Sequence, residues 1–159
     1  MSSLTCQAPP MLVDRDAFVA AVVLVCEQSF FMFAGPATPE VAARVAEDTT
    51  WFEVTVKFSG PYCGTLSVAI PEALATDLFA AFLGFDQSDV PALESVEDLM
   101  GEFANMACGT WLSQLTTTEC FGLEHPVVAV TASPSLAGAT LLCVNDQPLA
   151  VNARWAEAA

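Results

Sequence analysis

Positive charge is scarce in this chain of 159 residues. Only four lysine and arginine residues stand against 19 aspartate and glutamate residues, which gives a formal net charge of −15 at pH 7. A surface this anionic repels phosphate backbones and anionic lipid headgroups. We therefore expect no nucleic acid and no membrane surface among its partners. A basic surface of another protein, or a partner that carries a metal ion, fits the charge better.

Metal ligands are also few. His125 is the only histidine, and the nearest cysteine, Cys120, has no second pair of ligands with which it would complete a zinc site. We expect no metal bound by this chain alone. The six cysteines are compatible with three disulfides, but Met1–Val13 lacks the basic segment of a secretion signal, and most cysteines lie in apolar runs. We predict reduced thiols and a cytoplasmic location. The thiols expected to be buried and unreactive are Cys26, Cys63, Cys108 and Cys143.

A long uninterrupted apolar run is missing as well. The longest, Ala17–Gly35, is broken by Glu27 and Gln28, whereas a membrane-spanning helix needs about 20 clean apolar residues. With 54% hydrophobic and 14% charged residues, the chain has enough apolar surface for a packed core, which excludes disorder as its main state. We expect residues 1–13 to form a flexible leader and residues 14–159 a single domain.

The hydrophobic pattern alternates between the periods of helices and strands. It predicts helices over 14–33, 71–84 and 93–115, a short helix or loop over 38–48, and strands over 51–59, 65–70, 126–132, 140–145 and 149–154. Gly60-Pro61-Tyr62 joins the first two strands in an antiparallel hairpin. Because hairpins follow one another along the chain, an antiparallel α+β sheet is favoured over a parallel, doubly wound one.

The segment 98–109, DLMGEFANMACG, carries the polar pattern that points to chemistry. On a helix, four of its residues share one strip about 60° wide: Asp98, Glu102, Asn105 and Gly109. Nearly every other position is apolar or small, so most of this helix must be buried. The residues expected in the core are Leu99, Phe103, Met106 and Trp111.

The strip permits two interpretations. An asparagine holds a water molecule by hydrogen bonds, and a glutamate pairs with an ammonium group or orients the same water. Glu102 and Asn105, both expected to be accessible, therefore suit a hydrolysis whose electrophile and metal ion come from elsewhere. The alternative is an unrelated α+β domain in which the strip is only the solvated face of a core helix.

The ordered set Asp-x3-Glu-x2-Asn-x3-Gly resembles the signature of the CheC/CheX family of chemotaxis phosphatases. The similarity extends to Lys57–Gly84, which resembles the hairpin and helix of the family, and to Ala17–Gly35, which resembles its first long helix. Phe121–Val130 resembles the strand that follows the signature helix. The resemblance implies an α+β fold in which two long helices lie on a mainly antiparallel, six-stranded sheet with pseudo-twofold halves.

The resemblance also implies an activity, the hydrolysis of the aspartyl-phosphate of a CheY-like response regulator. It assigns the attacking water to Asn105 and the regulator's active-site lysine to Glu102, while Asp98 and Gly109 support the motif. Mg²⁺ is supplied by the regulator. Since the first long helix has no second Glu and Asn pair, the resemblance implies the single-site, CheX-like branch and a homodimer.

The chain departs from the family after Gly109, where Thr110-Trp111 replaces the Asn-Ala that family members often carry. This departure keeps a second function open. In that alternative the chain is a non-catalytic module that docks on a response regulator or a flagellar switch component.

Overall fold

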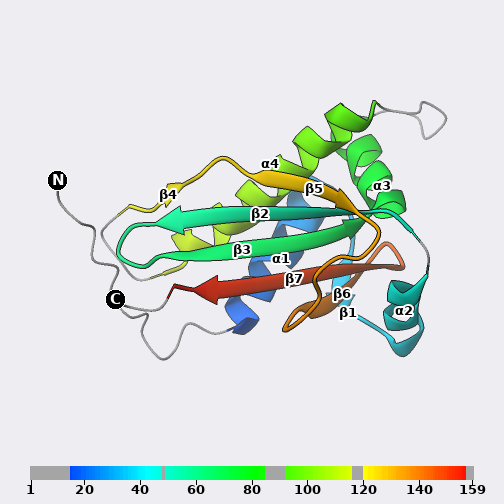
Figure 1. Ribbon diagram of the computed structural model, residues 1–159, viewed down its shortest axis with the longest axis horizontal. Helices are drawn as coiled ribbons and strands as arrows, with labels where there is room; N and C mark the ends of the chain where they lie inside the picture. Colours follow the sequence, from blue (N-terminus) through cyan, green and yellow to red (C-terminus); the bar gives the residue numbers. More distant parts are fainter. Residues whose placement is uncertain (1–14, 48, 85–91, 116–119, 157–159) are drawn as a thin grey trace.

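The computed structural model describes residues 15–47, 49–84, 92–115 and 120–156 (Figure 1). The expected leader lies outside these ranges, and the single domain over residues 14–159 stays a prediction. The described helices are α1 (Arg15–Ser29), α2 (Pro39–Ala43), the 3-10 helix η1 (Arg44–Ala46), α3 (Glu72–Leu83) and α4 (Leu93–Ser113). The described strands are β1 (Ala34–Pro36), β2 (Trp51–Ser59), β3 (Gly64–Pro71), β4 (Gly122–Leu123), β5 (Val127–Thr131), β6 (Thr140–Val144) and β7 (Gln147–Trp155).

The strands form one antiparallel sheet in the order β1-β6-β7-β3-β2-β4, with β5 also paired to β2. Helices α1, α3 and α4 lie on one face of this sheet, and Figure 1 shows the other face without a helix across it. The α+β class and the antiparallel sheet are therefore confirmed. The count of six strands is wrong, because the described residues contain seven. The pseudo-twofold relation of the halves stays a prediction.

The seventh strand arises where one extended run is divided in two. β4 pairs with Phe58 and Ser59 of β2, whereas β5 pairs with the opposite end of the same strand, from Trp51 to Thr55. The three-residue strand β1 is too short for a recognisable period. The helix α1 ends at Ser29, four residues earlier than predicted, and β1 begins soon after it. In the turn between them, Phe31 adopts a positive φ of 56°.

The two longest helices, α1 and α4, pack against each other in opposite directions. Phe18 near the start of α1 meets Trp111 near the end of α4, with ring centroids 5.3 Å apart, whereas Phe30 just past α1 meets Phe103 at 5.2 Å. Trp111 also contacts Trp155 of β7 at 5.0 Å. Burying each such ring contributes about 2 kcal/mol, so these contacts fix α4 against the sheet.

The β2–β3 hairpin matches its prediction closely. β2 spans the predicted residues, and its alternate side chains are buried on the helix side of the sheet: Phe52, Val54, Val56 and Phe58. Pro71 precedes α3 as its N-cap instead of opening its first turn, because it still pairs with Trp51 in the sheet. The helix ends as predicted at Gly84, whose φ of 71° favours glycine.

The prediction of reduced thiols is wrong at one position. Cys63 is disulfide-bonded, so it is not the reduced thiol that was predicted. Cys63 lies in the loop before β3 and lines a surface cavity, so it is not held in the core as its apolar neighbours suggested. The other four described cysteines are free; Cys26 and Cys108 are buried as predicted, whereas Cys143 is only half-buried, so its predicted burial is wrong. The cytoplasmic location stays a prediction that this disulfide does not support.

Within the described residues, no helix combines the length and the hydropathy that crossing a bilayer requires.

Candidate functional site

Helix α4 carries the predicted strip on the side that faces away from the core. Asp98 and Glu102 are exposed, and Gly109 is half-buried. The opposite side holds the expected core residues Leu99, Phe103 and Trp111. Met106 is half-buried, so its predicted full burial is wrong. Met106 lies at the margin of the strip on a helical wheel, which explains its partial exposure.

Asn105 differs from the other residues of the strip in the environment of its side-chain oxygen. The residue is half-buried, and its Oδ1 atom is shielded from solvent without a hydrogen-bond partner. The prediction that Asn105 is accessible therefore holds only for part of the side chain. A buried acceptor without a donor costs about 1–3 kcal/mol. Any donor that reaches this oxygen, such as a water molecule, recovers that energy.

Asp98 and Glu102 open into a cavity of about 870 Å³ between the end of α3, the first half of α4 and β5. We call this cavity the α3–α4–β5 groove. Its lining residues are Phe79, Leu83, Ser95, Glu97, Asp98, Leu99, Gly101, Glu102, His125, Pro126 and Val128. Asn105 is not among them. The groove thus joins two of the four predicted site residues to side chains from other elements.

Two of the lining residues without an assigned role come from a segment that lies well after α4 in the sequence. His125 and Pro126 precede β5, and they reach the groove because β5 pairs with β2 alongside α4. No periodicity near His125 signals this position. Where strand pairing between distant segments brings a residue to a site, the sequence near that residue carries no pattern that predicts its position.

The two glycines of the motif segment have different surroundings. A Cβ on Gly101 would lie 3.5 Å from Cβ of Pro126 and 3.8 Å from Val128, so this buried glycine lets the β5 segment lie close to α4. A Cβ on Gly109 would meet nothing within 4 Å. Gly109 therefore leaves open space on the strip, one turn beyond Asn105.

The groove is acidic. Three carboxylates line it, from Glu97, Asp98 and Glu102, and none of the chain's lysine or arginine residues is among its described lining residues. In the part of the chain that the structure describes, no three His, Cys, Asp or Glu side chains are grouped so as to hold a metal ion.

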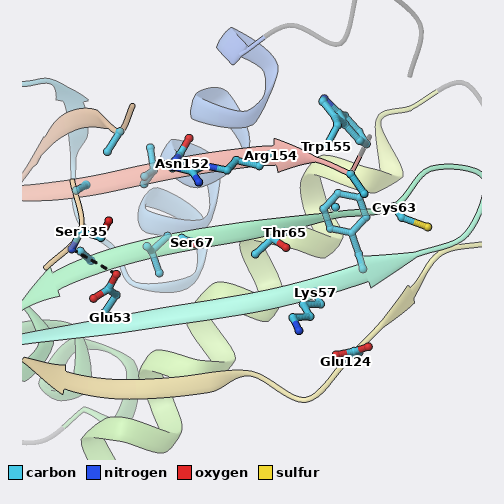
Figure 2. Close-up of a pocket in the computed structure, with 18 of the residues that line it drawn as sticks. Glu53, Lys57, Cys63, Thr65, Ser67, Glu124, Ser135, Asn152, Arg154 and Trp155 are labelled. Carbon is cyan, nitrogen blue, oxygen red and sulfur yellow. Dashed lines mark hydrogen bonds between the residues drawn. The ribbon is translucent and has the colours of Figure 1, made fainter. Parts of the chain in front are cut away.

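A second cavity, of about 550 Å³, lies on the helix-free face of the sheet (Figure 2). The strand register places Lys57, Thr65 and Arg154 in one row across β2, β3 and β7. At the other end, the carboxylate of Glu53 accepts a hydrogen bond from the Ser135 amide at 3.4 Å. This cavity contains none of the predicted site residues, and its two carboxylates and two cations leave it without a clear preference for ligand charge.

Comparison with known proteins assigns the chain to a family. Residues 52–143 match the family model described as chemotaxis phosphatase CheX. Among curated proteins, none matches at a significant level. The helix layer, the antiparallel sheet and this match define a CheC/CheX-like α+β protein. The chain belongs to the CheX family, which confirms the resemblance.

Solved structures agree on the fold. A putative chemotaxis protein from Desulfovibrio vulgaris Hildenborough is 19% identical, with 94% of this chain and 100% of that chain covered and a TM-score of 0.65. The chemotaxis protein CheX of Vibrio vulnificus is 17% identical, with 93% and 100% covered and a TM-score of 0.65. A chain in the CheX-CheY-BeF3-Mg complex from Borrelia burgdorferi is 15% identical, with 91% and 99% covered and a TM-score of 0.61.

Proposed function

We propose that this protein hydrolyses the aspartyl-phosphate of a CheY-like response regulator. Membership of the chemotaxis phosphatase CheX family supports this reaction class. The similar fold found in a complex with CheY supports the kind of partner. The observation that carries the assignment to residues is the Asn105 Oδ1 atom, an unsatisfied acceptor one helical turn from the exposed Glu102.

The proposed chemistry uses few groups of this chain. In the complex with the regulator, a rotation of the Asn105 side chain brings its Oδ1 atom to a water molecule, which donates a hydrogen bond to this oxygen and attacks phosphorus in line with the aspartyl oxygen. The new P–O bond forms as the bond to the aspartyl oxygen breaks; the aspartate leaves as a carboxylate, and the water proton passes to the phosphate product. Glu102 accepts a hydrogen bond from the regulator's active-site lysine. Positioning of this kind lowers a barrier by several kcal/mol, so two residues suffice.

Mg²⁺ belongs to the regulator in this proposal, where it neutralises charge on the phosphoryl group. Asp98 and Gly109 complete the motif without touching the reacting atoms. Asp98 lines the groove beside Glu102, and Gly109 leaves room for the regulator's backbone next to Asn105.

The test compares variants on a phosphorylated, Mg²⁺-loaded CheY-like regulator, with phosphate release and binding both measured. Asn105→Ala should lower turnover by about 10²–10³ and leave binding intact, because it removes one preorganised contact of the transition state. Glu102→Ala should weaken both, since its lysine contact exists in the bound complex as well. Asn152→Ala, on the other face of the sheet, is the matched control.

The same assay also tests a second function, that of a non-catalytic docking module. The Thr110-Trp111 sequence after Gly109 departs from the family pattern and favours a non-catalytic module that docks on a response regulator or a flagellar switch component. Equal dephosphorylation with the wild type and with Asn105→Ala, no faster than that of the regulator alone, with binding retained, would support that module and reject the phosphatase.

We also propose that the protein is a homodimer. Among the described strands, β1 pairs only with β6, which leaves its other side without a described neighbour, and the adjacent Phe31 and Phe33 are 78% and 90% exposed. Residues 29–39 contain no charged side chain. In a chain of net charge −15, this edge is where a second copy approaches with little local repulsion.

A further inference from the structure

The α3–α4–β5 groove combines two kinds of wall. One wall is apolar, built by Phe79 and Leu83 of α3 and by Pro126 and Val128. Leu83 remains 48% exposed, which leaves apolar surface beside the cavity for a partner to cover. The other wall belongs to α4 and presents carboxylates. A ligand that fills the groove must therefore satisfy apolar surface and negative charge together.

The charge of the groove is one-sided. Glu97, Asp98 and Glu102 line it, and the described basic side chains lie elsewhere: Arg44 bonds the Asp146 carbonyl, while Lys57 and Arg154 lie on the other face of the sheet. Among the described lining residues, His125 is the one basic side chain. A lysine or arginine suits both walls, because its aliphatic stem covers apolar surface while its charged head reaches a carboxylate.

The groove is held by long-range contacts. Val128 is fixed opposite Val54 in the sheet, and Gly101 allows Pro126 to lie against α4. Helix α3 contacts α4 on the other side. The site is thus concave before any partner arrives, which lowers the entropic cost of binding.

We propose that this groove receives a short segment of the partner regulator that presents one lysine or arginine between apolar side chains. This inference rests on the proposed function, and it adds to that function the surface by which the protein selects its regulator. Glu102 belongs both to the groove and to the strip, so a segment docked in the groove leads directly to Asn105. The groove governs affinity, and Asn105 governs the chemical step.

The charged wall is tested with two matched charge reversals on α4. Glu97 lines the groove, whereas Glu94, three residues earlier, is exposed and does not line it. Glu97→Lys and Glu94→Lys change the net charge equally, so they share any long-range effect. Glu97→Lys should raise the Kd and KM for the phosphorylated regulator by about tenfold, with kcat within twofold of the wild type. Glu94→Lys should change neither constant by more than about twofold.

The apolar wall has its own matched pair. Leu83 and Leu93 are terminal residues of neighbouring helices and are 48% and 54% exposed, but only Leu83 lines the groove. Leu83→Ser should weaken regulator binding several-fold, whereas Leu93→Ser should leave it unchanged. Thermal unfolding of all four variants shows whether a loss of binding reflects a loss of fold.

A measurement without the regulator separates this inference from the proposed function. The probes are the blocked peptides Ala-Leu-Lys-Leu-Ala and Ala-Leu-Glu-Leu-Ala, and the readout is the amide chemical shifts of Gly101, Glu102 and Val128. We expect the lysine peptide, and not the glutamate peptide, to shift these amides, and Glu97→Lys to abolish the effect.

Each outcome decides one question. Equal effects of Glu97→Lys and Glu94→Lys on a regulator that is still dephosphorylated would overturn the groove and leave the phosphatase intact. Groove shifts with the lysine peptide, but no regulator dephosphorylated, would support the groove and reject the phosphatase. Groove amides that neither peptide shifts, or that both shift alike, would overturn the proposed recognition of a cationic segment.

Discussion

At the scale of single residues, Asn105 combines a cost in stability with a proposed role in catalysis. Its Oδ1 atom is buried without a donor, and asparagine is a poorer helix former than alanine by about 0.5 kcal/mol. We predict that Asn105→Ala stabilises the fold by about 1–2 kcal/mol, which corresponds to a rise in Tm of about 2–6 °C. Thermal unfolding followed by circular dichroism measures this change.

The control for that prediction is Asn152→Ala, which replaces a half-buried asparagine in the sheet. It removes no orphaned acceptor and should not raise the Tm. A lower Tm for Asn105→Ala would mean that the Asn105 side chain contributes stabilising contacts, and the argument from its unsatisfied oxygen would fail.

The free thiols differ in reactivity for a physical reason. Burial raises the pKa of Cys26 to about 12, with a smaller contribution from the charge of Glu27, and burial also raises the pKa of Cys108 to about 12. Only the thiolate is nucleophilic. In native protein near pH 8 we predict fast reaction of the exposed Cys120 with a disulfide reagent, slower reaction of Cys143, and none of the two buried thiols.

The same pKa shifts give a stability prediction with a definite sign. Because the folded-state pKa values lie above the unfolded value near 9, the two thiols cause no loss of stability below pH 9. Stability falls as the pH rises from 9 towards 12, where only the unfolded state releases these protons readily. Cys108→Ala should flatten this fall in urea titrations. An unchanged slope, or rapid labelling of Cys108 in native protein, would contradict the burial of this thiol.

At the scale of elements, the β2–β3 hairpin depends on one glycine. A Cβ on Gly64 would lie 2.6 Å from the Phe58 ring and would also meet the backbone oxygen of Arg154, so neither neighbour gives way easily. We predict that Gly64→Ala destabilises the fold by about 3 kcal/mol. Gly109→Ala, with nothing near its Cβ, should stabilise α4 by about 1 kcal/mol. Urea unfolding measures both; equal effects would show that the packing at Gly64 is looser than described.

Elements with a clear period were predictable from the sequence. β2 was predicted to the residue and α4 to within two residues, because alternate apolar side chains and a wide apolar face mark them locally. β1 and β4 were missed, since strands of three and two residues are defined only by their partners across the sheet. The α1 helix was predicted too long because the apolar pattern continues through Phe33, whereas the backbone turns after Ser29.

At the scale of the whole molecule, the net charge of −15 governs self-association. If two copies join through the β1 edge, salt should strengthen the dimer by screening their repulsion. Phe33→Asp should produce a monomer in analytical ultracentrifugation, whereas Val127→Asp, 66% exposed on the opposite edge strand β5, should not. A monomeric wild type at high salt would refute the homodimer, and a monomer only with Val127→Asp would move the interface to β5.

The sequence by itself determined the α+β class, the course of the long elements and the strip on α4. The strip was readable because a helix turns by 100° per residue, so the spacing of Asp98, Glu102 and Asn105 assigns them to one side without any knowledge of their neighbours. The family resemblance rested on the same local spacing, and the match over residues 52–143 bears it out.

Only the tertiary structure decided what surrounds that strip. The groove beside Glu102 exists because β5 pairs with β2 and because α3 contacts α4, and neither contact leaves a local signal in the sequence. The shielding of the Asn105 oxygen and the disulfide at Cys63 likewise have no local signal in the sequence. Local backbone geometry thus places a side chain on a face of its own element, whereas long-range packing decides whether that side chain meets water, a cavity or another part of the chain.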